Sequence, residues 1–339
     1  MRDERKKTKV NRELIALDKL AHRMKKEGKY REAEEKYNLA LKIDRDDVYA
    51  LVGLGDLKRR IKKFKEAVHY YQRALEVEES NKFALAGLGD TYRGLREMDK
   101  ALEVWLHYLS LYPDDYMVMT RVADGFRKKG DRKKAKEYYL MALQRKPNDP
   151  YALMGMGGIH VREGNNEEGL KFFEKLIEIS DGSIMALTSA ANIYRKRKQY
   201  EKAMGYYDRA LEIDPEDSHA WHGKADCFRG IKRYPSAIRA WRTALKYGME
   251  PRITLTRIGD AYMGLEELED AEENYKEALA LGYDKYAYLG MARMHTRRNQ
   301  ADNAYKIFSM LIEKEPDDLR IAAEFKRLDK RYPQIEKTV

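Results

Sequence analysis

The sequence predicts an all-α solenoid of nine tandem helix-turn-helix repeats of about 34 residues, followed by a C-terminal capping helix. Three observations lead to this prediction. A small residue followed four positions later by an aromatic one recurs nine times, and successive small residues are 34 positions apart seven times and then 33. A second small residue lies twelve positions before each of these, and a large apolar residue lies four positions earlier still. Only 8 prolines and 22 glycines interrupt 339 residues, which leaves room for long helices.

The spacing inside one repeat predicts two helices. In the second repeat, Leu51, Leu54 and Gly55 lie at i, i+3 and i+4, which is one face of a first helix. Ala67 and Tyr71 lie on one face of the second helix in the same way. The small residues let the two backbones approach, and the aromatic ring fills the gap between them. Because one hairpin cannot bury this face alone, each must stack on its neighbours.

The boundaries of the elements follow from the phase of the repeat. We expect a charged, partly disordered lead-in at residues 1–13, an amphipathic capping helix at 319–331 and a tail at 332–339. The nine repeats are expected at residues 14–47, 48–81, 82–115, 116–149, 150–183, 184–217, 218–251, 252–284 and 285–318.

Repeat five departs from the pattern because it is rich in glycine. Five of its glycines depart from the pattern: Gly155, Gly157, Gly158, Gly164 and Gly169. Each surplus glycine inside a helix costs about 1 kcal/mol relative to alanine. We therefore expect a soft point in this repeat, about which the two halves of the chain flex.

The composition restricts the class of protein. Charged residues make up 37% of the chain and hydrophobic residues 43%, with a net charge of +10, which suits an elongated body with much surface per residue. Cys227 is the single cysteine, so internal disulfides and cysteine-based zinc sites are excluded. The basic N-terminus lacks the apolar segment of a secretory signal, and no stretch approaches the apolar length of a membrane span. We therefore expect a soluble, cytoplasmic protein without a membrane span, for which association with a membrane-bound complex through partners stays open.

The repeat resembles the tetratricopeptide repeat pattern W-x-x-L-G-x-x-Y…A-x-x-x-F…P. The second repeat shows the resemblance as LVGLGDLKRRIKKFKEAVHYYQRALEVEE, and the resemblance covers about residues 14–318. It implies a right-handed superhelix with an inner groove lined by the first helices. It also implies a non-enzymatic function, as a scaffold or adaptor that binds a protein or peptide partner in that groove within a multiprotein assembly.

The resemblance further implies that groove residues lie at the second, fifth, ninth and twelfth positions of each repeat. The candidate partner-binding residues are Tyr49, Asp56, Arg59, Phe83, Asp90, Arg93, Met117, Asp124, Arg127, Tyr151, Asn192, Arg195, His219, His222, Asp226, Arg229 and Asp260. The carboxylate clamp of chaperone-tail-binding members, with Lys at the fifth position and Asn at the ninth, is missing. Repeat two has Val52 and Asp56 at those positions.

Two interpretations of these positions stay open. Four repeats carry an Asp-x-x-Arg pair at the ninth and twelfth positions. Such pairs stabilise a helix by about 0.2–0.5 kcal/mol each, or they form a ladder of acceptors and forked donors that holds a partner chain. The aromatic and methionine residues at the second position either make hot-spot contacts with a partner or pack on the preceding hairpin.

No catalytic or cofactor motif appears in the sequence. A Gly-rich phosphate loop, a nucleophile elbow and an HExxH zinc motif are all missing, so we expect neither an enzyme nor a bound cofactor. His219, His222 and Asp226 at i, i+3 and i+7 have a spacing that could hold a metal, but without a fourth ligand we interpret them as polar groove wall. Cys227 is expected to be a buried small apolar residue.

Charge is unevenly distributed between the two kinds of turn. The turns inside the hairpins are basic, as at residues 58–63, 127–134 and 195–198, whereas the turns between hairpins are acidic. This basic edge supports the rival prediction, a protein that binds nucleic acid or an anionic surface. The interleaved aromatic residues that stack bases in RNA-binding proteins are missing from it.

Overall fold

The computed structural model describes residues 2–180 and 182–333, and the side chains of residues 12–180 and 182–333. These residues form nineteen α-helices and no strand, which confirms the predicted all-α repeat fold. The chain divides into two compact units, Met1–Asn165 and Asn166–Val339. The division falls inside predicted repeat five. No helix of the described part is both long enough and apolar enough to cross a membrane.

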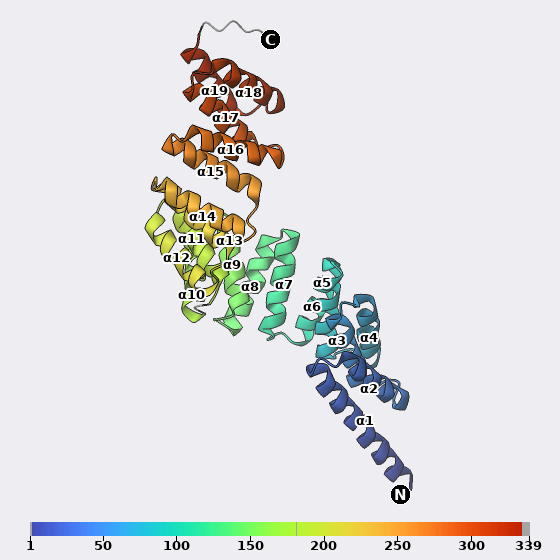
Figure 1. The fold of residues 1–339 in the computed structure, drawn as a ribbon. Coiled ribbons are helices and arrows are strands. Elements are labelled where there is room, and N and C mark those ends of the chain that lie inside the picture. The colour runs from blue at the N-terminus through green and yellow to red at the C-terminus, as the bar shows by residue number, and fades with distance from the viewer. Residues whose placement is uncertain (1, 181, 334–339) are drawn as a thin grey trace. The chain divides into compact units, whose positions relative to one another are not determined.

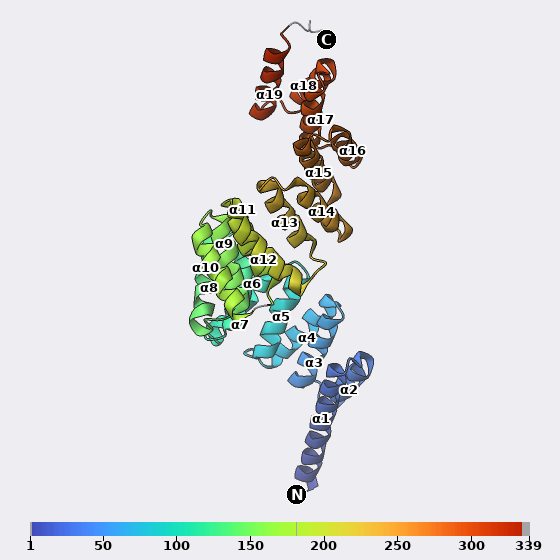
Figure 2. The same cartoon turned by 60° about the vertical axis from the view of Figure 1, so that its left-hand side comes forward.

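The first unit contains the hairpins of the first four repeats and the first helix of the fifth (Figures 1 and 2). Its helices are α1 Arg2–Lys26, α2 Tyr30–Ile43, α3 Val48–Arg60, α4 Phe64–Val77, α5 Lys82–Gly94, α6 Met98–Leu111, α7 Tyr116–Lys129, α8 Arg132–Arg145 and α9 Pro150–Arg162. Each helix packs against the next one along the chain, and the first helices of neighbouring repeats also touch, as α1 touches α3 and α3 touches α5.

The second unit continues the same alternation (Figure 1). Its helices are α10 Asn166–Ile179, α11 Ile184–Lys196, α12 Tyr200–Ile213, α13 Ser218–Gly230, α14 Tyr234–Lys246, α15 Pro251–Leu265, α16 Leu268–Ala280, α17 Lys285–Arg297, α18 Ala301–Lys314 and α19 Leu319–Arg331. Here the first helices α11 and α13 touch each other, as do α15 and α17.

The two ends of the chain differ in how they compare with the prediction. Helix α1 begins at Arg2, so the expected partly disordered lead-in is helical from residue 2 onward, and only residue 1 of it lies outside the described residues. Helix α19 spans the residues for which the capping helix is predicted. Its Ile321 and Leu328 are buried against α17 and α18, where they cover the apolar face of the last hairpin. Residues 334–339 of the predicted tail lie outside the described residues.

One aromatic side chain from each second helix organises the core. The buried ring of Tyr71 from α4 lies between α3 and α5. A Cβ atom on Gly55 would lie 2.7 Å from this ring, and a Cβ atom on Gly87 would lie 2.4 Å from it. Glycine at these positions therefore lets two consecutive first helices close around one ring. The other eight framework aromatics are also buried: Tyr37, Trp105, Tyr139, Phe173, Tyr207, Trp241, Tyr275 and Phe308.

The two kinds of turn have different structural requirements. Inside each hairpin, one residue needs a positive φ, and only some repeats place glycine there: φ is 83° at Gly164 but 62° at Lys62 and 60° at Lys198. Between hairpins, an acidic residue commonly caps the next first helix. Asp115 and Asp217 each accept a hydrogen bond from a backbone N–H of the first helical turn. Helix capping therefore accounts for part of the acidic edge.

The glycines of repeat five are mostly structural, which corrects the expectation that all five are surplus helical residues. Gly164 is the positive-φ turn residue and lies outside the helices. Gly155 lies against a buried framework tyrosine of α8, and Gly157 and Gly169 are buried at the small framework positions. A Cβ atom added to Gly158 would have no neighbouring atom within 4 Å. Among these five residues, Gly158 alone therefore fits the interpretation as a surplus helical glycine. Flexing at this repeat stays a prediction.

Candidate partner-binding surface

The side chains at the second position of the repeats are about half exposed or more, so none of them is buried against the preceding hairpin. Their exposed fractions run from 48% to 73%, while framework residues of the same helices, such as Leu51 and Leu153, are fully or almost fully buried. His219 at the same position is exposed as well. The exposed apolar residues are Tyr49, Phe83, Met117 and Tyr151 in the first unit, and Met185, Ile253 and Tyr286 in the second.

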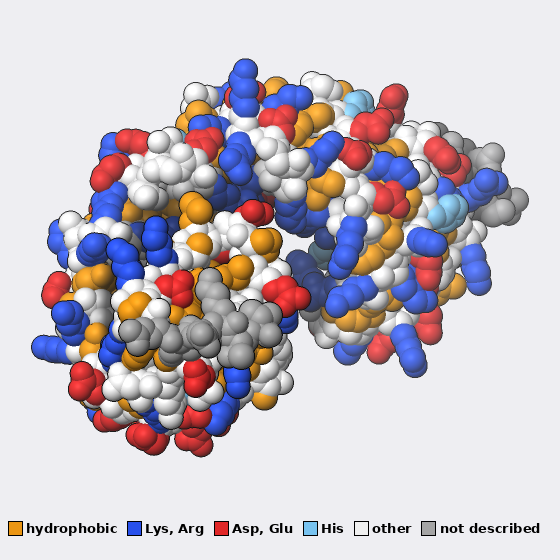
Figure 3. Space-filling view, turned by 90° about the horizontal axis from the view of Figure 1, so that it is seen from above, with side chains coloured by type: hydrophobic (Ala, Val, Ile, Leu, Met, Phe, Trp, Pro, Cys, Tyr) orange, Lys and Arg blue, Asp and Glu red, His pale blue; other side chains and the backbone are white. Residues whose placement is uncertain are grey.

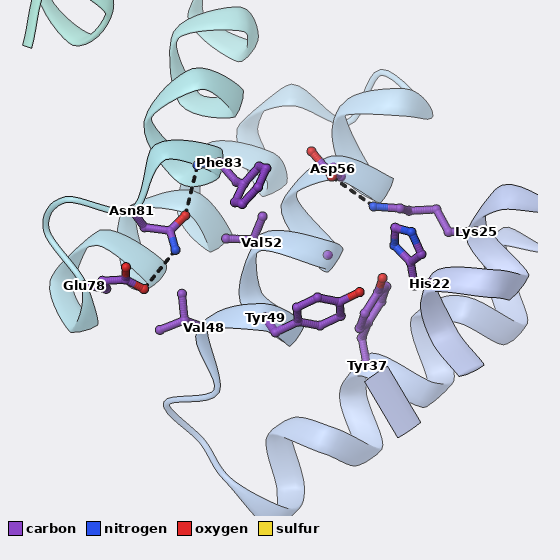
Figure 4. Close-up of a pocket in the computed structure, with 11 residues that line it drawn as sticks. His22, Lys25, Tyr37, Val48, Tyr49, Val52, Asp56, Glu78, Asn81 and Phe83 are labelled. Atoms are coloured by element: carbon purple, nitrogen blue, oxygen red, sulfur yellow. Dashed lines mark hydrogen bonds and ion pairs between the residues drawn. The ribbon is translucent and has the colours of Figure 1, made fainter. Parts of the chain in front are cut away.

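In the first unit, α1, α3 and α5 enclose a cavity of ≈ 440 Å³ (Figure 4). Tyr49 and Phe83 stand at its two sides, with Val52 between them. The His22 ring lies beside Tyr49, with ring centroids 6.3 Å apart. Because most of the lining residues come from first helices, the cavity lies on the surface that the family resemblance predicts to be the groove.

The floor of this cavity contains a buried hydroxyl group with no partner. Tyr37 lines the cavity from α2, and its Oη has no hydrogen-bond partner among the described residues. In four other repeats the tyrosine at this framework position donates to the residue at the ninth position. In repeat one that position is His22, whose side chain does not accept from Tyr37. A buried hydroxyl without a partner carries a desolvation penalty that a bound acceptor would relieve.

The acidic residues at the ninth position have a structural role that the sequence analysis missed. In each of four repeats, the framework tyrosine fifteen residues later donates its hydroxyl hydrogen to the ninth-position side chain. The four bonds are Tyr71 Oη to Asp56 (2.7 Å), Tyr139 Oη to Asp124 (2.6 Å), Tyr207 Oη to Asn192 (2.9 Å) and Tyr275 Oη to Asp260 (2.8 Å). These buried hydroxyls need an acceptor, and the ninth position supplies it.

Where the framework aromatic is tryptophan, an arginine from the next repeat replaces the tyrosine hydroxyl. In repeat three, Arg121 Nε of α7 lies 3.5 Å from Asp90 Oδ1. In repeat seven, Arg257 Nη1 of α15 donates to both oxygens of Asp226, at 2.6 and 2.5 Å. Both arginines occupy the sixth position of a repeat that follows a tryptophan. The repeats that follow a tyrosine have glycine at this position, and the repeat that follows Phe173 has Ser189. The glycines are Gly53, Gly87, Gly155, Gly223 and Gly290. The type of framework aromatic in one repeat thus goes together with the residue at the sixth position of the next repeat. This correlation was the signal in the sequence from which the arginine contact could have been predicted.

The arginines at the twelfth position link neighbouring repeats. Arg59 lies 3.6 Å from Asp56 in its own helix and 3.7 Å from Asp90 in the next repeat. Arg195 donates to Asn192 at 3.0 Å in its own helix and to Asp226 of the next repeat at 2.7 Å. The remaining pairs stay within one helix: Arg93 with Asp90, Arg127 with Asp124 and Arg229 with Asp226. The side chains at the ninth and twelfth positions therefore bind one another within the protein. That they also contact a partner stays a prediction.

The cluster around Asp226 is an arginine-bound carboxylate. Arg195, Arg229 and Arg257 all form ion pairs with this buried side chain, so its oxygens are already bound. Burial and the nearby Arg257 guanidinium lower the pKa of His222 to about 4, which keeps the imidazole neutral at pH 7. The described residues contain no group of three His, Cys, Asp or Glu side chains that could hold a metal ion.

The repeats match a known family. One model of the tetratricopeptide repeat matches residues 184–217, and a second matches residues 19–76, 52–116, 122–184 and 256–318. The chain belongs to the tetratricopeptide repeat family. This confirms the resemblance found in the sequence. Tetratricopeptide repeats form a scaffold for protein–protein interaction, and the family is typically non-enzymatic.

Solved structures of tetratricopeptide repeat proteins share the fold at low identity. The C-terminal part of a repeat-containing protein from Cytophaga hutchinsonii has a TM-score of 0.59 at 17% identity, covering 70% of this chain and 98% of its own. PilF of Pseudomonas aeruginosa has a TM-score of 0.54 at 17% identity, covering 62% and 96%. The Cut9–Hcn1 hetero-tetramer of the APC/C contains a chain with a TM-score of 0.57 at 14% identity, covering 88% of this chain and 58% of its own. No curated protein matches the sequence.

The single cysteine of this tetratricopeptide repeat chain is part of the framework. Cys227 is fully buried on α13, and burial raises the pKa of its thiol to about 12. A buried thiol with a raised pKa is a poor nucleophile, because only the thiolate reacts. The expectation of a buried small apolar side chain agrees with this environment.

Proposed function

We propose that this tetratricopeptide repeat protein is a non-enzymatic scaffold or adaptor that binds a segment of a partner protein along its first helices, within a multiprotein assembly. The row of exposed apolar side chains at the second position carries the proposal. Apolar side chains that are exposed in register on one set of helices are typical of a surface that a partner covers. The cytoplasmic location stays a prediction from the composition.

The cavity between α1, α3 and α5 supports a specific contact in the first unit. Its apolar sides, Tyr49 and Phe83, suit an apolar side chain of the partner. The buried Tyr37 hydroxyl at its floor offers a hydrogen bond that no described residue accepts. Lys25 and Asp56 close one end of the cavity with an ion pair of 2.9 Å. A cavity with mostly apolar walls and a few polar groups is the usual form of a site that receives a single side chain.

The contacts of the basic edge weaken the rival proposal of a nucleic acid or anionic surface ligand. Lys58 is buried and forms ion pairs with Glu34 and Glu66. Arg197 pairs with Glu167 in the same way. On the face drawn in Figure 3, basic and acidic side chains are interspersed, with apolar side chains between them. A protein gains affinity for a phosphate backbone when its cations neutralise phosphates and release the bound counterions. Cations that already pair with carboxylates of the protein contribute less to this release.

A double substitution, Tyr49→Ser with Phe83→Ser, tests the proposal. Both side chains are exposed, so we expect the fold to lose little stability. Binding of partner proteins should weaken by about tenfold or more, because aromatic side chains at the centre of an interface dominate its affinity. The measurement is quantitative mass spectrometry of proteins retained from a cell extract by the immobilised full-length chain.

A matched control replaces Leu140 and Met141 with serine. These residues of the second helix α8 are about as exposed as Tyr49, at 47% and 42% against 49%, but they lie outside the row of first helices. The control should retain the same proteins as the unmodified chain. Equal loss from both variants, or normal binding by the Tyr49 and Phe83 variant, would show that the partner surface lies elsewhere.

A further inference from the structure

Arginine makes up half of the residues that line a cavity of ≈ 680 Å³ near the C-terminal end of the second unit. The cavity lies between α17 and α19, with Phe308 of α18 and Leu328 of α19 among its apolar lining residues. Glu324 is its only acidic lining residue among the described side chains. The five arginines that line it, called here the arginine pocket, are Arg293, Arg297, Arg320, Arg327 and Arg331.

Two of the five guanidinium groups, those of Arg293 and Arg320, bind the carboxylate of Glu324. Arg293 forms a two-pronged contact with Glu324, with Nε 2.8 Å from Oε2 and Nη2 2.5 Å from Oε1. Arg320 Nε lies 3.3 Å from Oε1 of the same residue. This contact shows the geometry with which the surface holds a carboxylate, because a planar guanidinium presents two parallel N–H donors.

The other three guanidinium groups have no carboxylate partner among the described side chains. Arg297 donates to the backbone carbonyl of Met263 at 2.6 Å, and Arg331 donates to Asn299 Oδ1 at 3.3 Å. Arg327 is exposed and has no hydrogen bond or ion pair to a described residue. Like charges that line one cavity repel one another, and an anion bound between them would relieve the repulsion.

We propose that the arginine pocket binds the carboxylate side chains of an acidic segment in the partner protein. The proposal rests on the proposed function, for which it names the chemistry of the partner at the C-terminal end of the second unit. Carboxylates suit the site because the pocket already holds one of its own, and because Arg297, Arg327 and Arg331 carry positive charges that no described carboxylate pairs.

The neighbouring cavity favours a polypeptide over a nucleic acid. This second cavity, of ≈ 660 Å³, shares Arg293 and Arg320 with the arginine pocket. It is also lined by further cations, by carboxylates and by exposed apolar side chains. The cations are Arg229, Arg252, Arg257 and Lys285, the carboxylates are Asp260, Asp284 and Glu315, and the apolar side chains include Ile253 and Tyr286. A polypeptide can match this mixture of cations, carboxylates and apolar side chains residue by residue, whereas a phosphate backbone has no group that complements the carboxylates or the apolar side chains.

Fluorescence anisotropy with the full-length chain tests the proposal. The probes are a fluorescein-labelled peptide of repeated Glu-Glu-Leu triplets, the same peptide with Gln for Glu, and a labelled oligouridylate. We expect the glutamate peptide to bind and the glutamine peptide to bind about tenfold more weakly or not at all. The double variant Arg327→Gln, Arg331→Gln should weaken binding of the glutamate peptide by about tenfold.

The control variant Arg233→Gln, Arg239→Gln changes the net charge by the same amount at exposed residues at the start of α14. Its affinity for the glutamate peptide should stay within about twofold of the unmodified chain. Circular dichroism melting of each variant checks the fold, and Arg327→Lys with Arg331→Lys, which keeps the charge, should show an intermediate affinity.

Three results would overturn the proposal: equal binding of both peptides, equal weakening by the control variant, or tighter binding of oligouridylate that depends on the same arginines. The last result would indicate a nucleic acid ligand. The Tyr49→Ser, Phe83→Ser variant should bind the glutamate peptide normally, because those residues belong to the first unit. Failure of the arginine pocket and failure of the proposed function are thus separate outcomes.

Discussion

At the scale of single residues, the fifth position of a repeat lies next to the N-cap of the following first helix. In repeat eight, Thr256 Oγ1 donates to Asp284 at 3.0 Å, which pairs a donor with an acceptor. In repeat one the same position holds Asp18, and its neighbour Asp47 is also a carboxyl group. Burial and the Asp47 carboxylate raise the pKa of Asp18 to about 7. A buried carboxyl group and a half-buried one therefore repel each other where repeats four and eight pair a threonine donor with an aspartate acceptor.

This carboxyl pair predicts that stability falls as the pH rises. The unfolded chain releases the Asp18 proton near its usual value of 3.8, whereas the folded chain keeps it up to about pH 7. Between these values the folded state binds more protons, so unfolding becomes easier as the pH increases from about 4 to 7. Asp18→Asn should therefore raise the free energy of unfolding at pH 8 by about 1–3 kcal/mol and change it little at pH 4. Urea denaturation at both pH values measures this, and parallel pH profiles for the two proteins would contradict it.

At the scale of the single helix, what surrounds a glycine decides its effect. Gly158 and Gly155 lie on the same helix, α9, one turn apart. A Cβ atom on Gly158 would meet no atom within 4 Å, whereas a Cβ atom on Gly155 would lie 2.2 Å from Cζ of Tyr139. Gly158 only weakens the helix, whereas Gly155 makes room for the buried ring of Tyr139. Composition alone does not separate these two roles.

We expect opposite effects from alanine at these two positions. Gly158→Ala should stabilise the protein by about 0.5–1 kcal/mol, since alanine has the higher helix propensity and the space is open. Gly155→Ala should destabilise it by about 1–3 kcal/mol, since the ring of Tyr139 or the α9 backbone must move. The midpoint of thermal unfolding checks both changes. A loss of stability from Gly158→Ala would show that this glycine has a structural role as well.

At the scale of the whole chain, the core consists of clusters that each link neighbouring helices. The cluster of repeats seven to nine runs from Ala225 to Met294, and the cluster that includes the cap runs from Leu289 to Leu328. Each hairpin is stabilised by the repeats next to it, and a solenoid of this kind gains little from distant repeats. The division of the chain into two compact units agrees with this pattern.

Nearest-neighbour stabilisation predicts that part of the second unit folds alone. A fragment of residues 184–339 keeps four complete hairpins and the cap α19, so its last hairpin remains covered. We expect this fragment to be soluble and helical and to unfold cooperatively. Circular dichroism and a urea titration check these properties. A disordered fragment would show that contacts with the rest of the chain are needed for folding.

The repeated pattern by itself determined the fold class, the phase of the repeats and the framework aromatics. It could do so because helix formation and hairpin packing follow from residue spacings of three, four and twelve, which recur nine times. The same phase located the second-position row, but burial or exposure of Tyr49 and Phe83 depended on how the preceding hairpin packs. That packing exists only in the folded chain.

Tertiary structure alone decided the partners of the polar groups. Asp56 accepts from Tyr71, fifteen residues later, and Asp226 binds Arg195 and Arg257 from the two adjacent repeats. The spacing of residues along one helix does not contain these contacts, because they depend on the distance and rotation between neighbouring helices. The arginine pocket has the same origin. Its side chains come from α17 and α19, and only the packing of the cap against the last hairpin gathers them around one carboxylate.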